Sequence, residues 1–357
     1  MDCKRQILRL VTVMLAVLSF AGCKKSPDKI LEENGQGVVM IVNQYYYKIT
    51  LPTGAEWYFT GFDNNGDMEN FTFEESEIQK NKAMITGTGF IISADGKILT
   101  NRHVATPSID FTDAKHSVAN VFNSFKQMIQ EQMRQMSARY DELNSKKAEC
   151  YSFGEWGEPI VDEEQLSQIN EEQQQLSNSY NAAVETWNKI DNIDVSEIKI
   201  EPVYDVSVAY NNSFVTKLSD LAPCVVTAVS KDADVDLAML QLKNKRTPDN
   251  ASVLELADSD TEIKVDDKLY MIGFNAGFSL SNTSQGIKAQ ITSGNISQTS
   301  DNNKIMYTIP ALPGSSGSPV FNEYGKIVAV NFAGVSTTQS FNYGIKLKKV
   351  RRFVDDN

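Results

Sequence analysis

Apolar and polar positions in the first third of the chain predict β-strands. Residues 38–42 form a continuous apolar run, residues 45–51 alternate, and residues 86–104 fit two strands joined by an Asp-Gly turn. The same strand-like pattern of apolar and polar residues returns after residue 197. Further strands are expected at 223–229, 232–242, 268–274, 290–296, 304–309, 320–330 and 340–347, with a short closing helix at 348–356.

A different pattern occupies residues 112–195, where apolar side chains recur at steps of three and four. This spacing predicts two amphipathic helices, separated by a Gly/Pro-containing break at 151–159, that form an antiparallel coiled-coil hairpin. The expected seam positions are Ile129, Met133, Met136, Tyr140, Leu143, Leu166, Ile169, Gln173, Leu176, Tyr180, Ala183, Trp187 and Ile190. Two interpretations stay open. The hairpin either buries only its own seam, or it is an arm for a partner, a substrate or self-association, with Phe153 and Trp156 exposed at its tip.

The N-terminus has the pattern of an export signal. Residues 1–22 combine early positive charges with an apolar core that is short for a membrane span. Small residues then precede Cys23, which resembles the lipidation site of bacterial lipoproteins; the alternative is an ordinary secretory signal with a chance cysteine. We therefore expect a lipid tether at 23–36 and a lipid-anchored protein of the bacterial cell envelope that faces the periplasm.

Composition and charge narrow the function classes. The chain has 357 residues, 41% hydrophobic, and a net charge of −12, which suits one large domain or two small ones and argues against nucleic-acid binding. Beyond the N-terminus only Cys150 and Cys224 remain, which allows at most one disulfide. With only two histidines and no nucleotide motif, neither a metal site nor a cofactor is expected.

Three short stretches carry candidate chemistry. Residues 313–319 are rich in Gly and Ser, so they suit either a plain loop or a tight turn that exposes a serine beside main-chain N–H groups. His103 follows a strand and could be structural, or it could accept a proton from a serine. The acids at 232–236 precede another strand. They form either a solvated turn or the carboxylate that orients a catalytic histidine.

In the order His103, Asp236, Ser316, these stretches resemble the chymotrypsin-like serine proteases. The sequences 87–92, 99–104, 236–238 and 314–318 are closest to the motifs of the bacterial Deg/HtrA branch, here without a PDZ domain. The resemblance implies a mainly β fold of two antiparallel β-barrels with the helical hairpin inserted. The expected domains are a signal peptide at 1–22, a tether at 23–36, the first barrel at 37–111 and 196–262, the hairpin at 112–195 and the second barrel at 263–357.

The resemblance also implies roles for individual residues. Ser316 would be the nucleophile, His103 the general base and Asp236 its orienting partner; Asp236 is chosen over the nearby acids because it directly precedes a Leu-Ala pair. The N–H groups of Gly314 and Ser316 would form the oxyanion hole. An uncharged substrate pocket is expected at Pro310, Asn331, Phe332 and Ala333. The function implied is an exported serine endopeptidase acting on proteins or peptides. The alternative is a catalytically silent scaffold that binds partner proteins through the hairpin.

Overall fold

A computed structural model describes residues 24–357, apart from 233, 259–260, 300–301 and 335–340. The predicted signal peptide and Cys23 lie outside the described residues. The chain divides into two compact units. The barrel unit contains residues 24–46, 82–108 and 202–357, and the arm unit contains residues 47–81 and 109–201.

The first barrel is a ring of six strands. Its order is β1-β5-β6-β11-β10-β9, and a pairing between β1 and β9 closes the ring. The strands are β1 (Val38–Thr50), β5 (Ala83–Ile91), β6 (Lys97–Thr100), β9 (Lys199–Tyr210), β10 (Ala222–Val229) and β11 (Ala238–Leu242). Inward-facing aliphatic side chains such as Ile41, Ile98 and Leu240 are completely buried. Each such side chain contributes about 1.5–3 kcal/mol to stability.

The second barrel closes in the order β12-β15-β16-β19-β18-β17. Its strands are β12 (Lys268–Gly273), β15 (Gln290–Gln298), β16 (Lys304–Tyr307), β17 (Pro319–Asn322), β18 (Ile327–Gly334) and β19 (Asn342–Lys346). The helix α8 (Leu347–Asp355) follows, and its Val350 and Phe353 are buried. One apolar cluster contains residues of both barrels, among them Met40, Phe90 and Phe321. The predicted mainly β fold with two antiparallel six-stranded barrels is confirmed.

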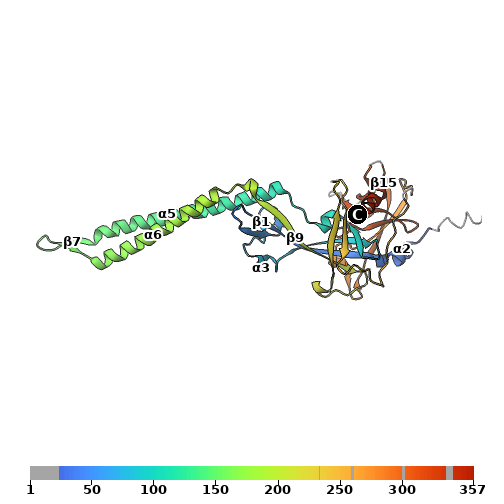
Figure 1. The fold of residues 1–357 in the computed structure, drawn as a ribbon, viewed down its shortest axis with the longest axis horizontal. Helices are drawn as coiled ribbons and strands as arrows, with labels where there is room; N and C mark the ends of the chain where they lie inside the picture. Colours follow the sequence, from blue (N-terminus) through green and yellow to red (C-terminus); the bar gives the residue numbers. More distant parts are fainter. Residues whose placement is uncertain (1–23, 233, 259–260, 300–301, 335–340) are drawn as a thin grey trace, which may run out of the picture. The chain divides into compact units, whose positions relative to one another are not determined.

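The arm unit is built on two long antiparallel helices, α5 (Phe111–Glu149) and α6 (Glu163–Asp191), which lie side by side in Figure 1. Each helix begins at an aspartate cap, Asp110 or Asp162, whose side chain accepts hydrogen bonds from the first turn. A two-stranded ribbon of β7 (Tyr151–Phe153) and β8 (Pro159–Val161) joins them. The predicted helical hairpin is therefore present.

The seam between the two helices is only partly apolar. Ile129, Leu143 and Ile169 are buried, but the expected seam residues Tyr140 and Tyr180 are 38% and 37% exposed. Polar contacts between the helices fill the remainder, and they include Arg139 with Glu172, Lys147 with Asn170, Gln173 with Asn144, and Lys126 with Asp191. The burial of the hairpin's own seam therefore explains only part of its apolar pattern.

Residues 47–81, which the sequence assigned to the first barrel, belong to the arm unit. They contain the end of β1 (residues 47–50), β2 (Glu56–Phe59), β3 (Gly61–Phe62), β4 (Met68–Glu69) and the single-turn helix α3 (Glu75–Ile78). Trp57 packs against Phe122 and Phe125 of α5, with ring centroids 5.0 and 6.2 Å apart. Strand patterning alone could not reveal these aromatic contacts with a helix about sixty residues away.

Candidate active site

His103 and Asp236 meet because β6 and β11 are neighbours. The strands pair antiparallel with Ala238 opposite Thr100, so the chain leaving β6 and the chain entering β11 lie at the same end of the sheet. His103 stands three residues after Thr100, in the single-turn helix α4 (Arg102–Ala105), and Asp236 stands two residues before Ala238. The strand register thus brings together a histidine and a carboxylate that are 133 residues apart.

The Asp236 carboxylate holds the histidine through two contacts. One oxygen lies 2.5 Å from His103 Nδ1, and the other accepts the His103 main-chain N–H at 3.1 Å. The main-chain carbonyl of Asp236 accepts the Asn101 side-chain amide at 2.8 Å. The Asp236 side chain is 15% exposed and that of His103 is 43% exposed. This geometry directs Nδ1 toward the carboxylate and leaves Nε2 for other chemistry.

The carboxyl of Asp236 is held in its ionised form. Burial by itself would raise its pKa, but the hydrogen bonds and charge of His103, together with the charge of Arg102, outweigh burial and lower the pKa below its usual range. The group can therefore serve as a fixed anion that stabilises a positive imidazole.

The turn that carries Ser316 depends on two glycines with left-handed backbone, Gly314 (φ 99°) and Gly317 (φ 86°). A Cβ on Gly317 would lie 2.0 Å from the Thr88 carbonyl oxygen and 3.2 Å from the Asn101 nitrogen. The serine turn therefore packs directly against the segment that leads to His103. Ser316 itself is half-buried.

The carbonyl groups of residues 313–316 are all anchored. Those of Pro313 and Ser316 accept main-chain N–H groups, from Ala276 at 2.6 Å and from Thr88 at 2.8 Å. The Ser315 carbonyl accepts the side-chain amide of Asn331 at 3.0 Å. Within the described residues, by contrast, the N–H groups of Gly314 and Ser316 donate no hydrogen bond. Free main-chain donors on a fixed backbone, here two residues apart, are the kind of group that stabilises an oxyanion.

Thr88, on β5, is the residue that the sequence analysis missed. It is completely buried, and its hydroxyl donates to the Gly314 carbonyl at 2.8 Å and accepts the Phe274 N–H at 3.0 Å. Its own carbonyl accepts the Thr100 hydroxyl at 2.8 Å. Thr88 thus links the histidine strands to the serine turn. The only indication in the sequence was that Thr88 lies in the 87–92 segment. That segment was used to identify the family resemblance and not to assign a role to Thr88.

Asn331 does not line an open pocket, contrary to the sequence-based expectation. It is 1% exposed; besides the bond to Ser315, its side-chain oxygen accepts the Tyr307 hydroxyl at 2.7 Å. The β18–β19 register shifts only after Asn331, between Asn331 and Ala333, so the residues on the two sides of Phe332 do not follow one alternation. Asn331 positions the serine turn instead.

Of the other three predicted pocket residues, Pro310 and Phe332 are more accessible than Asn331. For Ala333, only the main-chain pairing is described. Pro310 is exposed at the start of the loop that leads to Ser316, and Phe332 is half-buried. The ammonium group of Lys304 lies 4.8 Å from the centre of the Phe332 ring. Ala333 pairs through its main chain with Tyr343 of β19.

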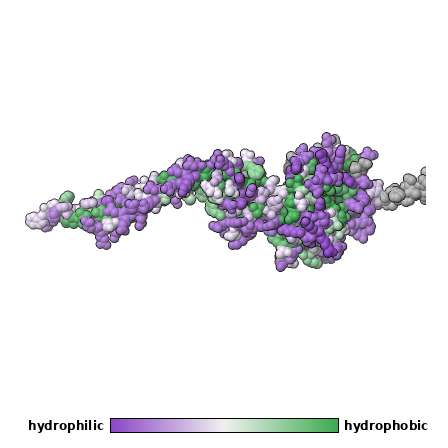
Figure 2. Space-filling view, viewed as in Figure 1, coloured by the Kyte–Doolittle hydropathy of each residue, from purple (hydrophilic) through white to green (hydrophobic). Residues whose placement is uncertain are grey.

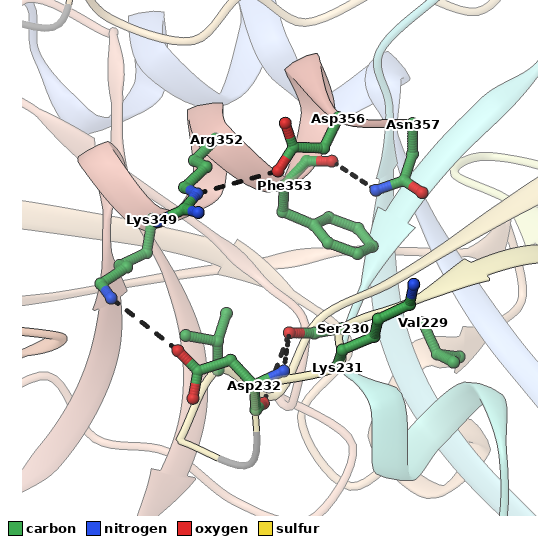
Figure 3. A pocket seen from close by; sticks show the side chains of 10 residues that line it. Val229, Ser230, Lys231, Asp232, Lys349, Arg352, Phe353, Asp356 and Asn357 are labelled. Carbon is green, nitrogen blue, oxygen red and sulfur yellow. Dashed lines mark hydrogen bonds and ion pairs between the residues drawn. The ribbon is translucent and has the colours of Figure 1, made fainter.

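A separate hollow of about 370 Å³ lies beside the Asp236 segment (Figure 3). It is formed by residues 229–232, Val235 and the end of α8, and none of the three candidate catalytic residues lines it. Lys349 faces Asp232, and Arg352 faces Asp356, both at 3.8 Å. Two of the three positive side chains that line the hollow thus face carboxylates within it.

Metal and disulfide chemistry receive no support from the described part of the chain. No cluster of His, Cys, Asp and Glu suited to a metal ion occurs there. Cys150 and Cys224 are both free and buried, so the one disulfide that the sequence allowed is not formed. Among the helices of the described residues, none is long and apolar enough to cross a membrane.

Comparisons with known proteins found a family model, a curated relative and a solved structure that resemble this chain. Residues 198–330 match the family model for the trypsin-like peptidase domain, a segment that includes Asp236 and Ser316. A curated relative, the probable periplasmic serine endoprotease DegP-like of Pseudomonas putida (strain GB-1), is 29% identical over 128 residues, or 35% of this chain and 24% of that protein. The match thus spans about a quarter of that relative's length. A crystal structure of the serine endoprotease from Yersinia pestis has a TM-score of 0.44 and 13% identity, and covers 94% of this chain and 67% of that one.

Proposed function

We propose, on the premise that this chain is a trypsin-like peptidase of the chymotrypsin-like Deg/HtrA type, that it hydrolyses peptide bonds through an acyl-enzyme on Ser316. The observation that carries the proposal is the His103–Asp236 pair beside a turn in which the N–H groups of Gly314 and Ser316 are unpaired. These are the parts that acyl transfer needs: a base with an orienting anion, a serine and an oxyanion hole.

In the proposed mechanism, His103 accepts the proton of the Ser316 hydroxyl at Nε2, because Nδ1 is held by Asp236. The Ser316 oxygen forms a bond with the substrate carbonyl carbon, and the negative oxygen that results accepts hydrogen bonds from Gly314 and Ser316. His103 then donates its proton to the leaving amine as the C–N bond breaks. Water, activated by the same imidazole, hydrolyses the ester and releases the second product.

We place this activity outside the cytoplasm, on a protein held to a membrane through a lipid on Cys23. The N-terminal sequence supports this assignment, and so does the periplasmic name of the DegP-like relative. The substrates would be proteins or peptides, with an uncharged side chain preferred beside Pro310 and Phe332. The arm unit would bind a partner protein.

The test is hydrolysis of an unfolded protein such as casein by the wild-type chain and by Ser316→Ala. The proposal expects fragments from the wild-type chain only. Equal, negligible cleavage by both folded proteins would instead favour the scaffold function. That alternative rests on one observation, the long arm with exposed aromatic side chains.

A further inference from the structure

The tip of the arm unit exposes an apolar face that nothing in the described chain covers. In the β7–β8 ribbon, Tyr151 is opposite Val161 and Phe153 is opposite Pro159. Because side chains alternate between the faces of a strand, these four lie on one face. Tyr151 is 54% exposed, and Phe153 is 79% exposed.

The turn of the ribbon adds the most exposed large side chain at the tip. Trp156 is 91% exposed, and its main-chain N–H donates to the Glu158 carboxylate at 3.1 Å. Gly157, with φ 81°, completes the turn. Water-exposed Trp and Phe on a short, well-defined ribbon are costly unless a partner covers them, and such residues dominate the binding energy of protein interfaces.

The charge around this face is mainly negative. Residues 148–165 contain six acidic residues and no Lys, Arg or His. Within the described chain, no cation pairs with Glu149, Glu155, Glu158, Glu163 or Glu164, while the nearest lysines, Lys146 and Lys147, contact Glu142 and Asn170. The aromatic face therefore lies among carboxylates that no cation of the described chain neutralises.

The support beneath the ribbon fixes it on the helices. Cys150, the residue before β7, forms a buried cluster with Leu143 of α5 and Ile169 of α6. The Asp162 N–H donates to the Cys150 carbonyl at 2.9 Å, which joins the two strand bases. On the face drawn in Figure 2, most of the surface of the two long helices is hydrophilic. The ribbon is thus presented as a discrete, pre-formed surface.

We infer that this ribbon is a docking site for a basic polypeptide whose apolar side chains cover the aromatic face while its Lys and Arg side chains pair with the carboxylate rim. An anionic membrane would accept the aromatic residues but would be repelled by the acidic rim. A second copy would bring two acidic rims together. The inference refines the proposed partner role of the arm and does not depend on peptidase activity.

The test measures fluorescence anisotropy of a labelled 14-residue peptide of alternating Lys and Leu, with the full chain carrying Ser316→Ala so that no cleavage occurs. Peptides with Glu in place of Lys, or Ser in place of Leu, are the matched probes. We expect the Lys-Leu peptide to bind at least tenfold more tightly than either. We expect Phe153→Ser with Trp156→Ser to weaken binding at least tenfold. Phe214→Ser, which removes a 69% exposed aromatic ring of the barrel unit, should leave it unchanged.

A second variant tests the rim. Glu155→Gln with Glu163→Gln and Glu164→Gln should weaken binding about fivefold at low salt, and high salt should erase the difference. Equal affinity of the wild-type tip and the two tip variants would overturn the inference. So would tip-dependent binding to phosphatidylglycerol vesicles without peptide binding, or a tip-dependent dimer in sedimentation. The binding assay uses a chain without the Ser316 nucleophile, so a negative result there would not affect the peptidase proposal. A negative result in the peptidase test would likewise not affect the docking inference.

Discussion

Replacing Thr88 by Val should damage catalysis although Thr88 contacts no substrate in the proposed mechanism. Val has nearly the same shape but has no hydroxyl, so the buried Gly314 carbonyl loses its donor and the Phe274 N–H loses its acceptor. Each buried group left unpaired costs about 1–3 kcal/mol, which predicts a loss of about 2–4 kcal/mol in the free energy of unfolding if one of them is partly rescued by water.

The catalytic effect follows from the position of Gly314. Loss of one whole oxyanion donor typically lowers kcat by about 10²–10³. Thr88→Val leaves the Gly314 N–H in place but frees the peptide that follows it, so we expect a smaller decrease of about 10–100-fold in kcat with little change in KM.

The assay is steady-state hydrolysis of a fluorogenic peptide, combined with urea unfolding followed by circular dichroism. The control is Thr88→Ser, which keeps both hydrogen bonds and loses one methyl group; its kcat should stay within about threefold of wild type while its stability falls by about 1 kcal/mol. A folded Thr88→Val protein with kcat within twofold of wild type would refute the reasoning. An equal loss of kcat in both variants would also refute it, because it would point to packing and not to the hydroxyl.

Three further predictions follow from the same contacts. Asn331→Ala should lower kcat about tenfold or more with KM nearly unchanged, because the Ser315–Ser316 peptide loses an anchor; a raised KM alone would restore the pocket-wall assignment. Because the folded-state pKa of Asp236 is depressed, its stabilisation is present above about pH 4 and is lost as pH falls through the folded pKa; urea titrations should therefore show Asp236→Asn less stable than wild type at pH 7, with a gap that narrows below pH 4. Burial raises the pKa of Cys224 to about 12, so its thiol should react with iodoacetamide at pH 8 only after unfolding, and labelling of the native protein would contradict its burial.

Features that depend on short sequence segments, or on the pairing of two neighbouring strands, could be predicted from the sequence. The sequence showed a two-strand motif that ends at His103, and it showed the acids before the strand at 238–242. These two features come together because β6 and β11 pair. The exposed Phe153 and Trp156 also followed from helical periodicity on both sides of a Gly/Pro break. These features depend on short segments whose chemistry is readable in isolation.

Features that depend on long-range packing could not be predicted. Nothing local distinguishes Thr88 from other strand threonines, since its hydroxyl acquires its role from Gly314, 226 positions away. Asn331 was assigned to the pocket wall by the family resemblance, and its buried contacts with Tyr307 and Ser315 are not visible in the local sequence. Residues 47–81 were assigned to the first barrel because their alternating pattern gives no indication that Trp57 packs against a helix.

The central claim is that Ser316 is an activated nucleophile, and fluorophosphonate labelling tests it most directly. The wild-type chain, Ser316→Ala and Ser318→Ala would be treated with the probe under native conditions, with folding checked by circular dichroism and the modified residue located by peptide mass spectrometry. Labelling at Ser316 in the wild type and in Ser318→Ala, and none in Ser316→Ala, is the predicted result. A folded wild-type protein that takes up no label, or takes it up at another serine, would contradict the account.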